Sequence, residues 1–233
     1  MLNVEGLKSG YQRVQILHGV TLNIDEGEIV SVIGRNGVGK STFMKTVIGI
    51  IPAAEGKIFF QNEDISRQKA HLRAKLGIGY VPQGHGIFPF LSVEENLKMG
   101  RMIAPSPSGE DRMEHVYHYF PKLKDRRRQL AGTMSGGEQA MLSIGRVLVG
   151  NPSLLLLDEP SEGVQPNIVE LMGEIVKQIS EEMKLTVLMV EQHMGLMQQI
   201  SQRAYVMNKG IITHSLSRAE LTDSQAIQQY LSI

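Results

Sequence analysis

The segment from Gly34 to Ser41 constrains the fold and chemistry of this chain more than any other. Its sequence, Gly-Arg-Asn-Gly-Val-Gly-Lys-Ser, fits the pattern G-x-x-x-x-G-K-[ST]. That pattern requires a strand before it and a helix after it, and both are predicted here. The alternating run EIVSVIG leads into the loop. The helix-like run STFMKTVIGII begins at its last residue and stops at Pro52.

The residue types in this loop suit the binding of phosphate. Glycine lets backbone N–H groups turn inward around phosphate oxygens without a side chain in the way, and the helix starting at Lys40 adds its N-terminal dipole. Lys40 can reach the β- and γ-phosphates of a nucleotide, and the Ser41 hydroxyl can join the shell of a Mg²⁺ ion. We therefore predict a nucleotide site. Its binding residues are Gly34, Arg35, Asn36, Gly37, Val38, Gly39, Lys40, Ser41 and Thr42.

Composition excludes several other kinds of chemistry. The 233 residues include no cysteine, so disulfides, cysteine nucleophiles and thiolate metal sites are excluded. The 24 basic residues equal the 24 acidic ones, which gives no electrostatic reason to expect a nucleic-acid partner. No run approaches the roughly 20 apolar residues that cross a bilayer, and the start, MLNVEGLKSG, lacks the features of a secretory signal. We expect the protein to stay inside the cell.

Strand-like segments occupy both ends of the chain. Residues 2–33 alternate as strands do, GKIFFQ forms a further strand with Asn62–Asp64 as the turn after it, and GIGYVPQ is a buried strand. The apolar runs SLLLLDEP and LTVLMVEQ, with a helix at about 166–182 between them, suit a parallel sheet covered on both faces. YVMNKGIITH predicts a last hairpin, and a short helix follows.

Residues 86–150 have helical periodicity instead. Ser92–Glu95 forms a capping box at a helix start, Pro105–Gly109 is a loop, and Arg126–Arg128 is the solvated end of a helix. We therefore predict a single domain over residues 1–233. Its α/β core comes from 1–85 and 151–233 and encloses the helical insert.

Two acidic residues follow the apolar run Leu154–Leu157. A buried strand brings Asp158 out at its carboxyl end, where an α/β sheet has its ligand crevice, and there it can hold Mg²⁺ directly or through water. Glu159 is placed to polarise the attacking water as a general base. An isolated acidic pair of this kind is more simply a solvent-facing strand end, but together with the phosphate loop it favours catalysis.

The segment Met134–Gln139, with the sequence MSGGEQ, resembles the LSGGQ signature of ATP-binding-cassette (ABC) ATPases. Ser135 and Glu138 also form a capping box, and the two interpretations agree, because a capped helix start with two glycines presents bare amides to an anion. The resemblance implies that Ser135, Gly136, Gly137 and Glu138 meet the γ-phosphate of an ATP held by the other cassette of a dimer.

The resemblance extends over nearly the whole chain. It implies a P-loop NTPase fold, with a RecA-like core, an antiparallel β subdomain and an inserted α-helical subdomain. Tyr11 resembles the aromatic residue that stacks on adenine, and Gln83, in YVPQG, resembles the glutamine that senses Mg²⁺ and links the core to the helical lobe. The implied ligands are ATP and Mg²⁺. The implied metal-binding residues are Ser41, Gln83 and Asp158, and the implied catalytic residues are Lys40, Gln83, Glu159 and Gln192.

Two departures from the family pattern bear on the rate of hydrolysis. Where the family has SALD after the acidic pair, this chain has Glu162–Gln165, so that Gln165 replaces the aspartate. The switch histidine of the family aligns with Gln192, and His193 comes one place late, which points a side chain elsewhere at a strand end. Gln192 can donate an amide hydrogen bond to the γ-phosphate, but it carries no proton.

The segments IFPFLSVEENLKMG and LLLLDEPSEGVQP look most like the LivF-type subunit of branched-chain amino-acid importers, and EGVQP leans toward urea and short-amide importers. This resemblance implies an ATPase that lies peripherally at the cytoplasmic face of the inner membrane and powers import. Its partners would be a second cassette, either itself or a LivG-like subunit, two membrane permease subunits and, indirectly, a solute-binding protein, with no nucleic acid. Closure on ATP would be transmitted near Gln83 and residues 86–100. There, Phe88 and Phe90 are interpreted as aromatic core packing, with a docking surface as the alternative.

Two other functions remain as alternatives. One is a nucleotide-gated clamp that hydrolyses little ATP and regulates a partner complex; Gln192 supports it and Glu159 argues against it. The other is a soluble P-loop kinase, which would leave MSGGE unexplained.

Overall fold

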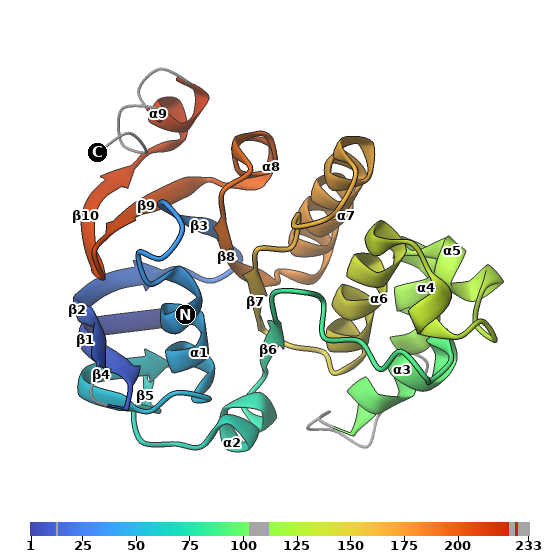
Figure 1. Cartoon of the computed structure of the whole chain (residues 1–233), viewed down its shortest axis with the longest axis horizontal. Helices are drawn as coiled ribbons and strands as arrows, with labels where there is room; N and C mark the ends of the chain where they lie inside the picture. The colour runs from blue at the N-terminus through green and yellow to red at the C-terminus, as the bar shows by residue number, and fades with distance from the viewer. Residues whose placement is uncertain (13, 103–111, 224–226, 228–233) are drawn as a thin grey trace.

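The computed structural model describes residues 1–12, 14–102, 112–223 and 227, and Figure 1 shows how their helices and strands are arranged. An antiparallel sheet from the N-terminal part of the chain lies at one end, a larger sheet runs through the middle, and a group of helices lies at the other end. This is the α/β architecture that the sequence predicts. The predicted loop Pro105–Gly109 lies outside the described residues.

The antiparallel sheet has the strand order β2-β1-β4-β5. Its strands are β1 (Leu2–Tyr11), β2 (Val14–Ile24), β4 (Ala53–Phe60) and β5 (Glu63–Asp64). The turn between β4 and β5 consists of Gln61 and Asn62, which both have positive φ, 50° and 68°. The predicted turn over Asn62–Asp64 is therefore wrong for Glu63 and Asp64, because these two residues pair with β4.

The larger sheet has the order β10-β9-β3-β8-β7-β6, and only its edge strand β10 runs antiparallel to its neighbour. Its strands are β3 (Ile29–Ile33), β6 (Ile78–Val81), β7 (Leu154–Asp158), β8 (Thr186–Glu191), β9 (Arg203–Asn208) and β10 (Ile211–Leu216). Every residue of β3, β7 and β8 is buried. That is the burial expected of parallel strands covered on both faces.

Two hydrophobic cores lie on the two faces of this sheet, because successive side chains of a strand point in opposite directions. Val30 and Leu156 belong to the core shared with α1 (Lys40–Ile48) and the antiparallel sheet. Ile29 and Leu157 belong to the core shared with helices from the second half of the chain. The sheet is thus fixed from both sides, and its strand ends keep their positions.

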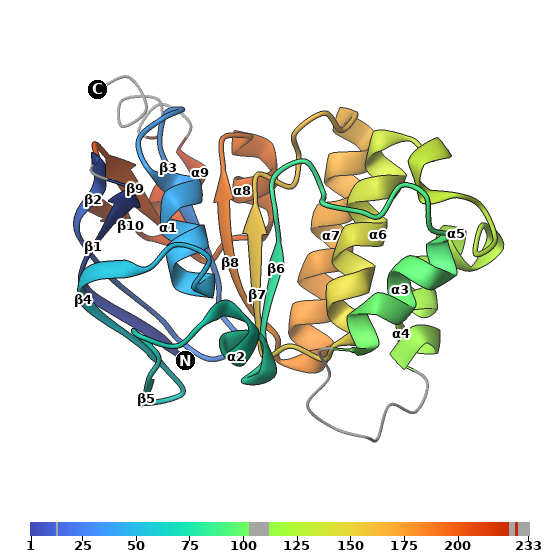
Figure 2. The same cartoon turned by 60° about the horizontal axis from the view of Figure 1, so that its bottom comes forward.

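The remaining helices lie mainly on the second face and at the far end (Figure 2). They are α2 (Ala70–Lys75), α3 (Val93–Arg101), α4 (Arg112–Tyr119), α5 (Pro121–Asp125), the 3₁₀ helix η1 (Ala131–Thr133), α6 (Gly136–Val149), α7 (Pro166–Met183), α8 (Met194–Ile200) and α9 (Arg218–Thr222). Helices α3 and α6 approach closely at Gly100, where a Cβ would lie 1.9 Å from the carbonyl oxygen of Arg146. No helix in these described segments is both long and apolar enough to span a membrane.

Helix ends follow local capping rules. Helix α1 ends at Ile48 and not at Pro52 as predicted, because Gly49 turns the chain with a left-handed φ of 86° and its amide bonds back into the helix. Helix α7 matches the predicted helix at 166–182. Arg126–Arg128 are exposed directly after α5, as predicted for the end of a helix.

Phe88 and Phe90 do not pack in the core, so that interpretation is wrong. The side chain of Phe90 is 89% exposed. Phe88 is half-exposed, and its ring lies against the guanidinium of Arg146, 5.1 Å from the ring centre. Both residues precede α3, in the helical segment.

The division of the domain at residues 85/86 and 150/151 stays a prediction.

Arg73 joins α2 to the end of α1 and is almost completely buried. Its guanidinium donates to the carbonyl oxygens of Thr46 and Val47 at 2.9 and 2.7 Å. It also donates to those of Ser66 and Gln68, both at 3.0 Å. Burial lowers the pKa of Arg73 to about 10, so the group remains charged at neutral pH and satisfies carbonyls that water does not reach.

We expect Arg73→Ala to lower the free energy of unfolding by about 3 kcal/mol, because it leaves buried carbonyl oxygens without donors. Urea denaturation measures this change. The control is Arg67→Ala, which removes an exposed arginine from the segment just before α2. Its free energy of unfolding should stay within about 0.5 kcal/mol of that of the unmodified chain. Equal effects of the two variants would contradict the structural role of Arg73.

Candidate functional site

The phosphate loop connects β3 to α1 at the edge where the parallel strands end, the upper edge in Figure 2. Gly37 and Gly39 have φ values of 80° and 112°, which glycine adopts without steric cost. Gly34 packs so closely on β9 that a Cβ would lie 2.3 Å from the Met207 carbonyl oxygen. At these three positions the backbone geometry of the loop therefore requires glycine.

Lys40 is the first residue of α1, and its side chain turns back into the loop. Its ammonium donates to the carbonyl oxygens of Gly34 and Arg35 at 2.8 and 3.1 Å. It also forms an ion pair with Glu159, with 3.3 Å between Nζ and Oε1. Because Lys40 is only 4% exposed, this charge has an anionic partner in a place that water hardly reaches.

Asp158 ends β7 and is completely buried. Each of its carboxylate oxygens accepts a hydroxyl: Oδ1 from Ser41 at 2.8 Å and Oδ2 from Tyr80 at 2.9 Å. Burial raises the pKa of Asp158, and the two hydrogen bonds oppose that rise. Burial and the charge of Asp158 raise the pKa of Tyr80, which therefore stays a neutral donor.

The carboxylate of Glu159 is surrounded by three side chains. Besides Lys40, Gln192 donates its Nε2 to Oε1 at 2.8 Å, and Gln83 donates its Nε2 to Oε2 at 3.4 Å. The backbone of Glu159 has a left-handed φ of 50°, which costs energy in a residue with a side chain and is frequent at functional sites. This turn directs the carboxylate toward the phosphate loop.

The turn after β8 places Gln192 at the site. The buried carboxylate of Glu191 accepts from the backbone N–H groups of Gln192 and His193 at 2.8 and 3.0 Å. His193 also borders this site, but its Nδ1 accepts from the backbone N–H of Leu196 and caps α8. The side-chain amide of Gln192 donates to Glu159 in this structure. Its predicted hydrogen bond to the γ-phosphate stays a prediction.

Two cavities adjoin at these side chains. One of about 280 Å³ follows the loop, and the other of about 450 Å³ lies over Glu191–His193. Asn36, Gln83 and Glu159 border both. The structure thus brings the predicted loop, Asp158, Gln83, Glu159 and Gln192 into one place.

Several residues at the site were not found from the sequence, among them Ser161, which borders the larger cavity. Ile16, on β2, borders the smaller cavity, and Glu191 and Tyr80 hold Gln192 and Asp158. Ile16 lies outside the motifs used in the prediction. Tyr80 lies in YVPQG and Glu191 in LTVLMVEQ, but these runs predicted only a strand at each residue and no role at the site.

The donors around the loop fit a magnesium ion bound together with a nucleotide. Ser41 Oγ and Asp158 Oδ1 converge to 2.8 Å, and Mg²⁺ is usually held by one or two such oxygens together with substrate phosphates and water. Among the described residues no group of three or more histidines and acids could hold a metal by itself. The set suits an ion that arrives with phosphates.

Among the described residues, Tyr11 and Ser135–Glu138 do not line either cavity. Tyr11 is half-exposed at the end of β1, and its stacking on adenine stays a prediction. Ser135 and Glu138 form both bonds of their capping box at the start of α6. Helix α6 begins at the same upper edge as α1 in Figure 2, and both views show β6 and β7 between the two helices, so this signature lies apart from its own loop.

Comparison with known proteins identifies the family of this chain. The family model for the ABC transporter matches residues 17–162, which include the phosphate loop, the signature and the acidic pair. The chain belongs to the ABC transporter family. It is an ATPase that binds ATP or ADP and has the P-loop NTPase fold, as the resemblance implied.

Its similarity to individual proteins extends over its whole length. It is 41% identical over 232 residues to BraG of Pseudomonas aeruginosa, a high-affinity branched-chain amino acid transport ATP-binding protein, covering 99% of both. It is 34% identical to the probable branched-chain amino acid transport ATP-binding protein LivF of Archaeoglobus fulgidus, covering 98% of this chain and 97% of LivF. It is 33% identical to LptB of the lipopolysaccharide export system of Escherichia coli, covering 99% and 96%.

The fold is also that of solved cassettes. The ADP conformation of an ATP-binding cassette of an ABC transporter superposes with a TM-score of 0.84 at 26% identity, and the match covers 99% of this chain and 98% of that one.

We expect Lys40→Ala to weaken ATP binding by more than about a hundredfold, because a phosphate charge loses its cationic partner in a site with little water. Isothermal titration calorimetry measures the affinity. Lys75→Ala, at an exposed lysine of α2, should bind ATP as the unmodified chain does. Normal affinity in the Lys40 variant would remove the nucleotide from this loop.

Proposed function

We propose that this ATPase is the energy-supplying subunit of an importer of branched-chain amino acids. The observation that supports this most is its 41% identity to BraG over 99% of both chains. LptB, at 33% identity, is named for an export system, so the solute follows less directly from similarity than the reaction does. Urea and short amides, toward which the EGVQP segment leans, are the competing solute class.

The proposed catalytic step takes place between Lys40 and Glu159. ATP bound in the loop would bring phosphate oxygens to the ammonium of Lys40, which at present holds the carboxylate of Glu159 at 3.3 Å. Once released, Glu159 would accept a proton from the water that attacks the γ-phosphorus, while the leaving oxygen stays on ADP. Gln83 and Gln192 each donate to one oxygen of Glu159 and would keep it facing that water.

Mg²⁺ is part of this proposal. Ser41 and Asp158 would hold it, with Gln83 as a further candidate ligand. When bound, the ion would neutralise the charge of the β- and γ-phosphates. The buried Asp158 oxygens already have fixed positions through two hydroxyls, which suits an ion that demands regular geometry.

A second cassette would complete each site. Because α1 and α6 begin at one edge with β6 and β7 between them, the signature of a facing chain would be the one to reach this phosphate loop. Ser135–Glu138 would then present the N-terminus of α6, a 14-residue helix, to the γ-phosphate. The facing cassette would be a second copy of this chain or a LivG-like subunit.

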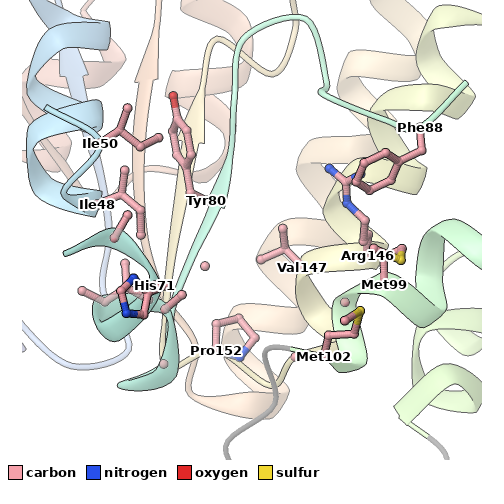
Figure 3. Close-up of a pocket in the computed structure, with 17 residues that line it drawn as sticks. Ile48, Ile50, His71, Tyr80, Phe88, Met99, Met102, Arg146, Val147 and Pro152 are labelled. Atoms are coloured by element: carbon pink, nitrogen blue, oxygen red, sulfur yellow. The ribbon is translucent and has the colours of Figure 1, made fainter.

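An apolar groove of about 480 Å³ separates α1 and α2 from α3 and α6. Figure 3 shows Ile48 and Ile50 on one side and Phe88 against Arg146 on the other. Met102, at the end of α3, is 78% exposed beside it. We assign this groove to the two membrane permease subunits, which would hold the chain peripherally at the cytoplasmic face of the inner membrane and link it indirectly to a solute-binding protein.

Glu159→Gln should reduce ATP hydrolysis by about a hundredfold or more while ATP still binds, because an amide cannot accept the proton of the attacking water. Steady-state phosphate release over a protein concentration series, with and without Mg²⁺, measures the rate. Glu170→Gln, an exposed acid on α7, is the control. Undiminished hydrolysis would remove Glu159 from the role of base. Tight ATP binding with almost no hydrolysis by the unmodified chain, alone and with its facing cassette, would favour the clamp.

Cells that lack this chain should lose uptake of radiolabelled leucine, isoleucine and valine, because the import would have no energy supply. The unmodified gene should restore uptake, and Glu159→Gln should not. Labelled urea and acetamide serve as the comparison solutes. If loss and rescue of uptake are confined to urea and acetamide, the protein belongs with the urea and short-amide importers. Unchanged uptake of all five solutes would contradict an import function.

A further inference from the structure

Tyr80 belongs at once to the groove and to the nucleotide site. It lies on β6, which pairs in parallel with β7, and its partner in the register is Leu156, two residues before Asp158. Its ring lines the groove together with Ile48 and Ile50, as Figure 3 shows. Its hydroxyl reaches past the strand to the carboxylate of Asp158.

Within the described part of the chain, the carboxylate of Asp158 accepts two side-chain hydrogen bonds, and the one from Tyr80 is the second. Ser41 donates to Oδ1 at 2.8 Å, and Tyr80 donates to Oδ2 at 2.9 Å. Ser41 belongs to the phosphate loop, whereas Tyr80 lies on β6, so each carboxylate oxygen is held by a hydroxyl from a different part of the fold. Two such bonds fix the rotation of the carboxylate group, whereas Ser41 alone would leave Oδ2 buried and without a donor.

We propose that Tyr80 is a positioning residue of the ATPase site, whose hydroxyl holds Asp158 so that its other oxygen faces Ser41 and the Mg²⁺ that accompanies ATP. This inference rests on the proposed role of Asp158 in holding that ion. Groups that orient a ligating carboxylate commonly affect metal affinity by about ten- to a hundredfold. Tyr80 would therefore act on ATP binding only when Mg²⁺ is present.

Tyr80→Phe is a clean test, because it removes one oxygen and keeps the ring in the groove. Calorimetric titration of the full chain with ATP, once with Mg²⁺ and once with EDTA, separates the two kinds of binding. We expect affinity in EDTA to stay within about twofold and affinity with Mg²⁺ to fall about tenfold or more. Tyr80→Leu, which lacks both hydroxyl and ring, should show the same loss specific to Mg²⁺.

Tyr119→Phe is the matched control. It also removes a tyrosine hydroxyl that donates to a carboxylate, that of Glu182 at 2.6 Å, between α4 and α7. Both of its ATP affinities should equal those of the unmodified chain. Thermal melting of all variants with EDTA and no nucleotide checks that the fold is intact.

The possible failures are distinguishable. If the unmodified chain gains no ATP affinity from Mg²⁺, the metal role of Asp158 fails and this inference fails with it. If the unmodified chain gains affinity and Tyr80→Phe gains as much, the metal role stands and only the inference about Tyr80 is overturned. Equal losses with and without Mg²⁺ also overturn it, because the hydroxyl would then support the fold alone.

Discussion

The ammonium group of Lys40 is the contact on which the rest of the site depends. It binds two carbonyl oxygens of its own loop and the carboxylate of Glu159, which follows a different strand. A buried cation tolerates such a place only when its partners are fixed. The loop therefore keeps its curled shape, and the turn after β7 remains beside it.

Those partners are fixed by the sheet. β3, β8 and β7 are neighbours in parallel register, so the loop, Gln192 and the acidic pair all emerge at one edge. A slip of one residue along β7 would exchange its two faces and carry Asp158 away from Ser41. The two cores prevent this slip, because Leu156 and Leu157 are buried in opposite ones.

Features written in consecutive residues could be predicted from the sequence. The phosphate loop, the acidic pair, the capping box at Ser135 and the long helix α7 all depend on local patterns, and the structure contains them as elements or turns. The contact of Tyr80 with Asp158 could not be predicted, because it depends on the register between β6 and β7. The exposure of Phe90 was missed because the burial of a side chain depends on tertiary packing, which the neighbouring residues in the chain do not specify.

The ion pair between Lys40 and Glu159 has a consequence for the order of events in a cycle. Glu159 pairs with the cation that the γ-phosphate would need in the proposed mechanism, so a triphosphate would have to displace this carboxylate. A diphosphate leaves that cation within reach of the carboxylate, and the pair can form again after the γ-phosphate departs. The proposed base would thereby also return the site to its resting ion pair and favour the release of ADP and phosphate.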